Sequence, residues 1–437
     1  MNMNLIIVSH PGKQHSFQTA YAIEKTSYDL EYCTTVYDKA GSLTRFVKPF
    51  LGKKDTTKAN TRRCEQIPDE KVHQILEWYG LYQLFMQRQR ISGDTFNKIN
   101  DRLNVWFGHR VAKIAKKRNA IAVISYDNNS MTLFSDLQEN APNIVRILDV
   151  SAANRIYMKK IYEGDCRLSP DFADKLREEC PVIQSDEVCQ RIQKEIDLSQ
   201  YFLVGSTFVK ESLEYSGVKP ERIYVCPYGV DTSCFYRKEF RVREENEPIR
   251  FVFVGGTKQL KGLSYMLDAF QMIDHKKATF TIVGADNLSA ELKAKYANDV
   301  IFAGMIPHDK IGDTLQNYDV MVFPSLGEGF SLAVTEAMAC GLPIISSTNT
   351  GVNDFIVDGR NGFIIPVQSS DAIAKKMRWF INHREQIPEM GENAIKTAKS
   401  LTWEMYHKKV AVAVEEIIER EKKNNSFGRQ HYTRFGQ

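Results

Sequence analysis

The sequence lacks several patterns that mark specialised classes of protein. Its eight cysteines form no CxxC pair and lie scattered along 437 residues, which suits reduced thiols better than a disulfide framework or a zinc site. Its nine histidines show no HxxxH or HExxH spacing. A net charge of +4 is too small on a chain of this length to indicate a nucleic-acid-binding protein.

Long hydrophobic runs are also missing. No apolar stretch approaches the ~20 residues of a membrane-spanning helix, and the opening MNMNLIIVSH lacks the basic segment and cleavage pattern of a secretory signal. We therefore expect a cytoplasmic protein with at most a peripheral association with a membrane. The chain is too long for one ordinary hydrophobic core, so about two domains are expected.

Short apolar runs recur along the chain, with helix-forming segments of about 10 to 15 residues between them. Uniformly apolar runs are typical of parallel strands that are covered by helices on both faces. The predicted fold class is therefore α/β. The predicted strands are LIIV (5–8), IAVI (121–124), IVRILDV (144–150), YFLV (201–204), IYVC (223–226), RFVFVG (250–255), FTIVG (280–284), VIFAG (300–304), VMVFP (320–324) and LPIIS (342–346).

This alternation stops around residues 235–249, where the sequence is charged and has no core face. We interpret this segment as a linker between two doubly wound domains, residues 1–234 and 250–400. Residues 401–437 begin as an amphipathic helix and end in a polar tail. We expect this helix to pack back on the first domain.

Two glutamates stand out in PSLGEGFSLAVTEAMACG (324–341), where the surrounding residues are almost all small or apolar. Ser331 is predicted to start a helix that carries Glu336, and no residue three or four positions away can pair with its carboxylate. A charge in such a place needs hydrogen-bond donors from elsewhere. Glu328 and Glu336 could both accept from the hydroxyls of a vicinal diol, or Glu336 could cap a neighbouring loop.

Two turns could bind a phosphate. In FVGGTKQLKGLSYMLDAF a Gly-Gly turn follows a strand, and Lys261 opens a helix whose first amides suit an anion. The loop GEGFSL (327–332) delivers the amides of Phe330, Ser331 and Leu332 to a second helix start. The alternative is that both are ordinary connections between a strand and a helix.

These motifs, together with VGADN and the stretch from FAGMIPHDK to GFIIP, resemble in their order the donor half of glycosyltransferase family 4. The resemblance covers residues 200–405, and glutamates separated by seven residues are a hallmark of that family. It implies a GT-B fold, in which two Rossmann-like domains face each other across a cleft. The second domain would bind most of a nucleotide-sugar.

The resemblance also implies roles for individual residues. Glu336 would bind the ribose diol of the donor, and the catalytic candidates Glu328 and Lys261 would contact the donor sugar and the diphosphate. Relatives commonly have an arginine where this chain has Gly255-Gly256, and Lys258 could replace its charge but not its planar geometry. The other donor-binding residues implied are Gly255, Gly256, Lys258, Gly329, Phe330, Ser331, Leu332, Gly12 and Lys13.

The first domain carries fewer signals. Its turn VSHPGKQHS matches the place where the family brings a glycine loop against the donor phosphates, which accounts for Gly12 and Lys13. Relatives often have a histidine after a middle strand, but residues 147–160 contain none. Ordinary capping at the end of a strand is the alternative role for the polar residues there. The acceptor-side candidates are His15, Asp149, Ser151 and Asn154.

The resemblance predicts a retaining glycosyltransferase that moves a sugar from a nucleotide-sugar to a glycan or a lipid-linked glycan. Neither a metal nor a cofactor is implied, and the sequence contains no DxD motif. Two alternatives remain open. One is a sugar-nucleotide epimerase of the same fold, and the other is a non-catalytic subunit that binds nucleotide-sugars or glycans.

Residues 43–63 indicate a contact with an anionic membrane surface. They contain seven Lys or Arg and one Asp, a local charge of +6 against +4 for the whole chain. A basic amphipathic segment can lie in an anionic membrane interface. The alternative is a solvated loop after a short packed helix, because Pro49 interrupts the helix. The apolar residues with the spacing of one helical face are Leu43, Phe46, Val47, Phe50 and Leu51.

Overall fold

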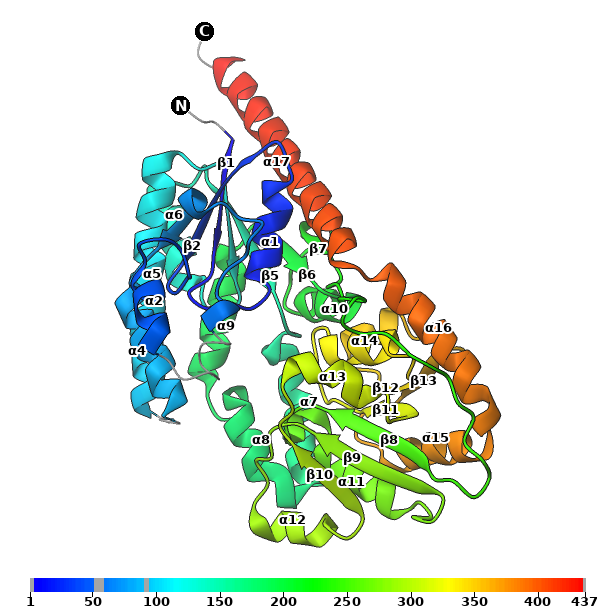
Figure 1. The fold of residues 1–437 in the computed structure, drawn as a ribbon. Helices are drawn as coiled ribbons and strands as arrows, with labels where there is room; N and C mark the ends of the chain where they lie inside the picture. The colour runs from blue at the N-terminus through cyan, green and yellow to red at the C-terminus, as the bar shows by residue number, and fades with distance from the viewer. Residues whose placement is uncertain (1–3, 51–58, 90–93, 435–437) are drawn as a thin grey trace.

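The computed structural model describes residues 4–50, 59–89 and 94–434 of the chain. Within these ranges the strands form two separate parallel sheets, one in each half of the molecule (Figure 1). The first sheet has the strand order β3-β2-β1-β4-β5-β6-β7, and the second has the order β10-β9-β8-β11-β12-β13. The α/β fold class and the two doubly wound sheets agree with the prediction.

The strands of the first sheet are β1 (Leu5–Ser9), β2 (Asp29–Thr34), β3 (Val72–Gln74), β4 (Ala122–Tyr126), β5 (Val145–Val150), β6 (Tyr201–Val204) and β7 (Ile223–Val225). Those of the second sheet are β8 (Ile249–Val254), β9 (Ala278–Val283), β10 (Val300–Gly304), β11 (Val320–Phe323), β12 (Ile344–Ser347) and β13 (Gly362–Ile365). The strands β2, β3 and β13 have no counterpart among the predicted apolar runs.

Helices flank both sheets. Those of the first half of the chain are α1 (Ser16–Glu24), α2 (Leu43–Val47), α4 (Glu77–Arg88), α5 (Asp94–Arg118), α6 (Met131–Asn140), α7 (Arg155–Leu168), α8 (Ala173–Glu179), α9 (Asp186–Leu198) and α10 (Thr207–Tyr215). Those of the second half are α11 (Leu263–Gln271), α12 (Ala290–Tyr296), α13 (His308–Leu315), α14 (Leu332–Ala339), α15 (Ser370–Asn382), α16 (Ile387–Ser400) and α17 (Trp403–Arg434). Short 3-10 turns include η1 (Lys48–Phe50) and η6 (Gln259–Lys261).

Each sheet contains a point where the chain changes direction. β1 lies between β2 and β4, and β8 lies between β9 and β11. The loops at the carboxyl ends of such neighbouring strands diverge and leave a crevice, which is where doubly wound folds bind ligands. We therefore expect a binding site at the turns that follow β1, β5, β8 and β11.

The long C-terminal helix α17 returns to the first domain. It runs along α1 on the outside of the first sheet (Figure 1). Its buried Val410 and Val414 share a core with Val8 of β1, and the hydroxyls of Tyr406 and Thr19 lie 2.8 Å apart. None of the helices in the described ranges combines the length and the apolar composition of a membrane span.

The helices α7 and α8 pack on the second domain, although they lie between two strands of the first sheet in the sequence. Their buried Met158 and Leu176 belong to the same apolar core as the strands β8 to β11. The buried carboxylate of Asp165 accepts hydrogen bonds from the Tyr265 hydroxyl at 2.6 Å and from Gln259 Nε2 at 2.8 Å. Residues 155–183 are therefore bound to the domain that carries the Gly-Gly turn and the glutamate loop.

Candidate active site

The Gly-Gly turn brings Lys261 to the crevice of the second sheet. η6 ends at Gly262, whose backbone is left-handed with φ +73°, and a Cβ there would lie 2.0 Å from the carbonyl oxygen of Pro324. Only glycine fits this close approach. The Lys261 ammonium then makes an ion pair with Glu328 of the loop after β11. Burial lowers the pKa of Lys261 to about 8, and the positive charge of Lys258 adds to this effect.

Glu336 finds its hydrogen-bond donor on a neighbouring helix. Its side chain is buried on α14, with 9% of the residue exposed, and Nε2 of His308 at the start of α13 lies 2.9 Å from Oε1. This hydrogen bond raises the pKa of His308. The His308 side chain is 75% exposed, so a ligand hydroxyl could take its place at the carboxylate.

The loop before α14 presents unbonded amides. Ser331 is the N-cap residue, as predicted, but its side chain makes no capping hydrogen bond. Among the described residues no acceptor is found for the amides of Phe330, Ser331 and Leu332. Gly329 allows the loop to touch the first domain, because a Cβ there would lie 2.2 Å from the carbonyl oxygen of Ser151. The amides at this helix start are free to bind an anion.

In the first domain, the turn after β1 brings Lys13 to a cleft that Phe330 and Leu332 of the second domain also line. The buried Nδ1 atom of His10 accepts from the amide of Gly12 at 2.7 Å. Burial lowers the pKa of His10 to about 4, so this ring is neutral and the hydrogen bond holds the turn. Lys13 follows at the cleft wall beside Leu332. Burial also lowers the pKa of Lys13.

The structure brings together two of the acceptor-side candidates. His15 Nε2 and Asp149 Oδ1 lie 3.0 Å apart, although the two residues are 134 positions apart in the sequence. The Asp149 side chain is only 2% exposed, and the His15 ring packs on Tyr228 with 4.4 Å between ring centroids. The buried carboxylate therefore orients the imidazole. His15 lines a cleft of about 740 Å³ together with Lys13, Ser151, Phe330 and Leu332.

The other two candidates differ in their surroundings. Ser151 lines the cleft, and its hydroxyl donates to Asp127 at 2.9 Å. Asn154 is the N-cap of α7: its Oδ1 accepts from the amide of Ile156 at 2.9 Å, and its side-chain amide donates to Ser216 at 2.7 Å. Capping, the alternative role weighed for Asn154, accounts for its contacts.

The second domain, which carries Lys261, Glu328 and Glu336, is similar to a known protein family. Residues 236–397 match the family model described as glycosyl transferases group 1. Residues 236–397, here called the group 1 domain, are thus similar to the group 1 glycosyltransferases. This domain contains the Lys261–Glu328 pair, Glu336 and the unbonded amides before α14.

Curated relatives of this group 1 domain share part of the chain. The chain is 35% identical over 185 residues to the D-rhamnosyltransferase WbpZ of Pseudomonas aeruginosa, and the matched region covers 40% of this chain and 48% of that protein. Over 210 residues it is 25% identical to a D-inositol 3-phosphate glycosyltransferase of Paenarthrobacter aurescens, 44% of this chain and 52% of that protein. The chain thus spans about half the length of the curated relatives it matches.

Solved structures resemble the whole chain. Sucrose-phosphate synthase from Thermosynechococcus elongatus superposes with a TM-score of 0.63 at 16% identity, over 95% of this chain and 98% of that one. Anabaena HepE in complex with UDP gives a TM-score of 0.61 at 13% identity, over 94% of this chain and 100% of that one. At such identities the likeness shows the fold alone. The GT-B fold that the sequence resemblance implied is confirmed.

The Gly-Gly turn of the group 1 domain stands where relatives commonly have an arginine. Gly255 has φ +158°, and a Cβ there would lie 2.8 Å from the Phe253 ring. The next turn is equally tight, since a Cβ on Gly284 would lie 1.9 Å from the Gly255 carbonyl oxygen. Lys258 stands exposed at the start of η6. It is the nearest cation to Lys261 in the turn, and its part in binding a phosphate stays a prediction.

Two carboxylates that hold this turn have no signal in the sequence. Glu179 at the end of α8 accepts from the amides of Gln259 at 3.2 Å and Leu260 at 2.8 Å, which are the first amides of η6. Asp165 of α7 binds the Gln259 side chain. Both acids come from a stretch that contains no motif, and only the packing of α7 and α8 brings them to the group 1 domain.

Proposed function

We propose that the protein is a glycosyltransferase that moves a sugar from a nucleotide-sugar to a glycan or a lipid-linked glycan. The proposal includes retention of the anomeric configuration, no need of a metal or cofactor, and action in the cytoplasm. It rests on one arrangement: a half-buried lysine, two glutamates and free amides lie in the turns of the group 1 domain, and Phe330 and Leu332 of those turns line one cleft with His15, which is paired with Asp149. HepE was solved with UDP, and a relative acts in amylovoran biosynthesis, which supports a nucleotide donor and a polysaccharide product.

In the second domain, each charged group has a partner within the protein, and the donor would take the place of that partner. The Lys261 ammonium would leave Glu328 for the diphosphate, and Glu328 would accept from hydroxyls of the donor sugar. The ribose diol would take the place of His308 on Glu336. As the bond from the anomeric carbon to the diphosphate breaks, negative charge grows on the leaving group, and Lys261 and the amides before α14 would stabilise it.

In the acceptor half, a hydroxyl must approach the anomeric carbon and lose its proton as the new bond forms. His15 is held on one ring nitrogen by the buried Asp149, so its other nitrogen could accept a hydrogen bond from that hydroxyl and position it. Lys13 would face the donor phosphates from the same wall. The two domains would exclude water where Gly329 meets Ser151.

A panel of nucleotide-sugars tests the proposal with the purified protein. Slow release of nucleoside diphosphate from one donor, and faster release with an acceptor, is the expected result. Formation of an epimer would indicate the epimerase instead, and binding without turnover would indicate a non-catalytic subunit. The anomeric proton of the product, read by NMR, decides retention, and turnover that persists in a chelator supports the absence of a metal.

A further inference from the structure

The first domain carries large exposed rings that the proposed transfer reaction does not use. Aromatic side chains usually bury most of their surface, and a cluster that does not do so marks an interaction site. Six exposed rings form such a cluster: Phe46 (68%), Phe50 (79%), Trp78 (69%), Tyr82 (49%), Phe85 (53%) and Trp106 (50%). All of them come from α2, η1, α4 and α5.

The packing of these elements puts the rings on one side of the domain. Trp78, Tyr82 and Phe85 have the spacing of a single face of α4. The ring of Tyr79 on α4 packs against α5, with its centroid 5.6 Å from that of Trp106. The carboxylate of Glu77 accepts from two amides at the start of α2, which fixes α2 beside the start of α4.

The face of α5 beside these rings is basic. Arg102, Trp106, Arg110, Lys113 and Lys117 are spaced by four, four, three and four residues, so they form one stripe along the helix. Three of the cations also line a groove of about 660 Å³ against residues 72–76, the segment that leads into α4. In the part of the chain that the structure describes, no carboxylate pairs with any cation of the stripe.

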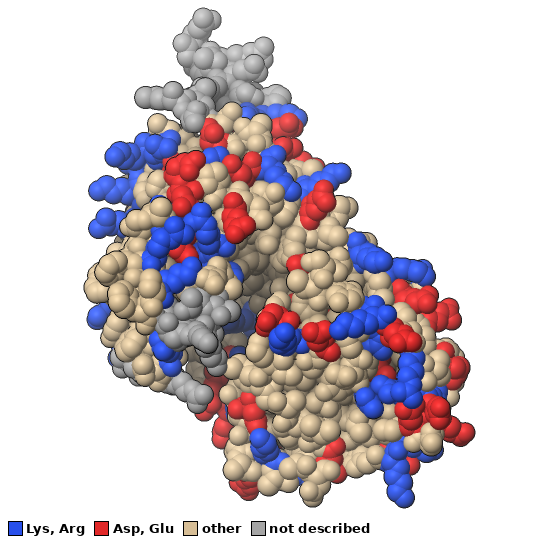
Figure 2. All heavy atoms as spheres, viewed as in Figure 1, with Lys and Arg blue, Asp and Glu red and all other residues tan. Residues whose placement is uncertain are grey.

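Charge and rings are concentrated in the same four elements. α2, η1, α4 and α5 together hold ten Lys or Arg and three Asp or Glu, an excess of seven on a chain whose total is +4. Figure 2 shows this flank on its left side, where Lys and Arg follow the upper edge beside α5 and uncharged surface lies below, over α2 and α4. The rest of the chain is therefore net acidic.

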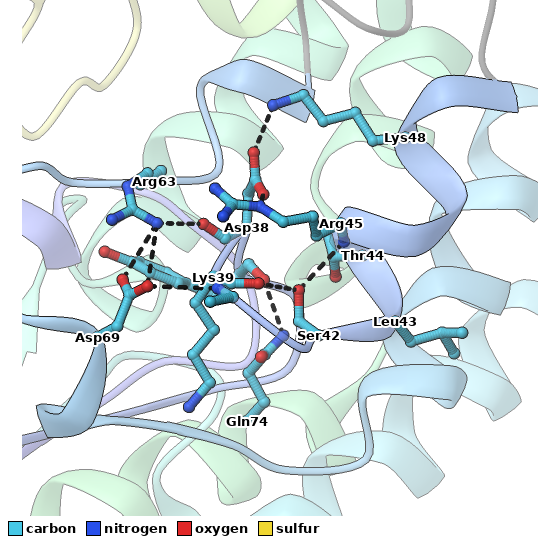
Figure 3. A network of polar contacts seen from close by, with 12 residues as sticks. Asp38, Lys39, Ser42, Leu43, Thr44, Arg45, Lys48, Arg63, Asp69 and Gln74 are labelled. Carbon is cyan, nitrogen blue, oxygen red and sulfur yellow. Dashed lines mark hydrogen bonds and ion pairs between the residues drawn. The ribbon is translucent and has the colours of Figure 1, made fainter.

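Three cations of the basic segment singled out in the sequence, residues 43–63, are paired with carboxylates inside the protein. Figure 3 shows Arg45 and Lys48 paired with Asp38, and Arg63 paired with Asp69 at 3.1 Å. Lys53, Lys54 and Lys58 lie outside the described residues. On the described part of this flank, the cations of the α5 stripe have no such carboxylate partner.

We propose that this surface, here called the α4–α5 face, docks the protein on a membrane that contains anionic phospholipids. The rings of α2, η1 and α4 would enter the headgroup region, and the α5 stripe would bind lipid phosphates, which is the arrangement of peripheral membrane proteins. Arg63 lines the cleft and donates to the carbonyl of Asp38 at 2.8 Å, and the Asp38 carboxylate pairs with Arg45 of α2, so the α2 end of this face lies near the place where an acceptor would enter. The inference deepens and rests on the proposed function, since it assigns the acceptor to the lipid-linked class.

Co-sedimentation with vesicles tests the docking without any need for turnover. The full-length protein should bind vesicles of phosphatidylcholine and phosphatidylglycerol, bind pure phosphatidylcholine far less, and detach in high salt. The double variant Lys113→Glu/Lys117→Glu should lower the partition coefficient by about tenfold or more, because each cation near an anionic surface contributes about 1 kcal/mol. The matched control Lys276→Glu/Lys277→Glu, on the second domain, should bind like the wild type.

The rings have a test of their own. Lipids brominated in their acyl chains should quench the tryptophan fluorescence, and Trp78→Phe/Trp106→Phe should remove this quenching while it keeps binding. Trp78→Ser should weaken binding, whereas Tyr215→Ser, an equally exposed ring elsewhere, should not. Equal binding to neutral vesicles, or normal binding of the Lys113/Lys117 variant, would overturn the inference. Vesicle binding without sugar transfer contradicts only the proposed function, and transfer without vesicle binding contradicts only the docking.

Discussion

At the scale of single residues, the buried carboxylate of Glu336 has a hydrogen-bond partner within the protein that a ligand could displace. Its internal partner His308 is mostly exposed, and in the proposed donor complex a ribose diol takes the place of this imidazole. We expect Glu336→Gln to weaken the binding of the nucleoside diphosphate by ~1.5–3 kcal/mol, the value of a hydrogen bond to a charged group. Calorimetry measures this loss. His308→Ala is the control and should bind as well as the wild type or better, whereas unchanged affinity of Glu336→Gln would disprove the diol assignment.

Lys261 leads to a prediction about pH. A lysine carries its charge below its pKa and loses it above, and burial has lowered the pKa of Lys261 to about 8. Donor affinity should therefore fall as the pH rises through about 8, where the ammonium loses its charge. Lys258→Ala removes a neighbouring positive charge, so it should raise the pKa of Lys261 and move the fall to higher pH.

Lys261→Ala provides the reference for this pH profile. It should remove the fall above pH 8 and lower kcat more than it raises the donor KM, because the ammonium faces charge that grows in the transition state. A variant with the turnover and pH profile of the wild type would show that Lys261 is an ordinary residue of the turn.

At the scale of elements, α8 supports the Gly-Gly turn from outside the group 1 domain. Glu179→Ala leaves the amides of Gln259 and Leu260 without their acceptor, and we expect the loss of about 1–3 kcal/mol of stability together with weaker donor binding. Glu179→Gln should restore part of both, since its amide oxygen can still accept. Thermal unfolding and calorimetry measure the two effects. The adjacent, exposed Glu178→Ala is the control, and if it behaves like Glu179→Ala the support is not specific.

At the scale of the whole molecule, the contact between the domains depends on a glycine. The Gly329 backbone touches the Ser151 carbonyl, and a methyl group there would force the two loops apart. We expect Gly329→Ala to hold the cleft open, which lowers turnover while nucleotide binding by the second domain persists. Small-angle scattering with nucleotide present should give a larger radius of gyration than the wild type.

Gly164→Ala is the control for this experiment, because a Cβ in the middle of α7 meets only the end of the Arg167 side chain at 3.9 Å. This variant should scatter and turn over like the wild type. A Gly329→Ala protein with full activity would show that the observed contact is not needed for transfer.

Much of this architecture could be predicted from local sequence. Ten strands coincide with apolar runs, because a strand buried on both faces must be apolar along its whole length. The sequences of β2 (DLEYCT) and β3 (VHQ) contain polar residues, so neither strand forms an apolar run that could be recognised. The turns that carry Lys261, Glu328 and the amides before α14 could also be located from sequence, because glycines and helix starts mark them, whereas their part in donor binding stays a prediction.

What the sequence by itself determined was therefore the set of buried strands, the α/β class and the local chemistry of the βα turns, all of which depend on residues close together in the chain. Only the tertiary structure decided which domain α7 and α8 join, that His15 meets Asp149, and that His308 serves Glu336. An amphipathic pattern shows that a helix has a face to bury, but not the surface it is buried against. That choice is made by contacts between segments far apart in the chain, and the same contacts left the rings of α2 and α4 exposed.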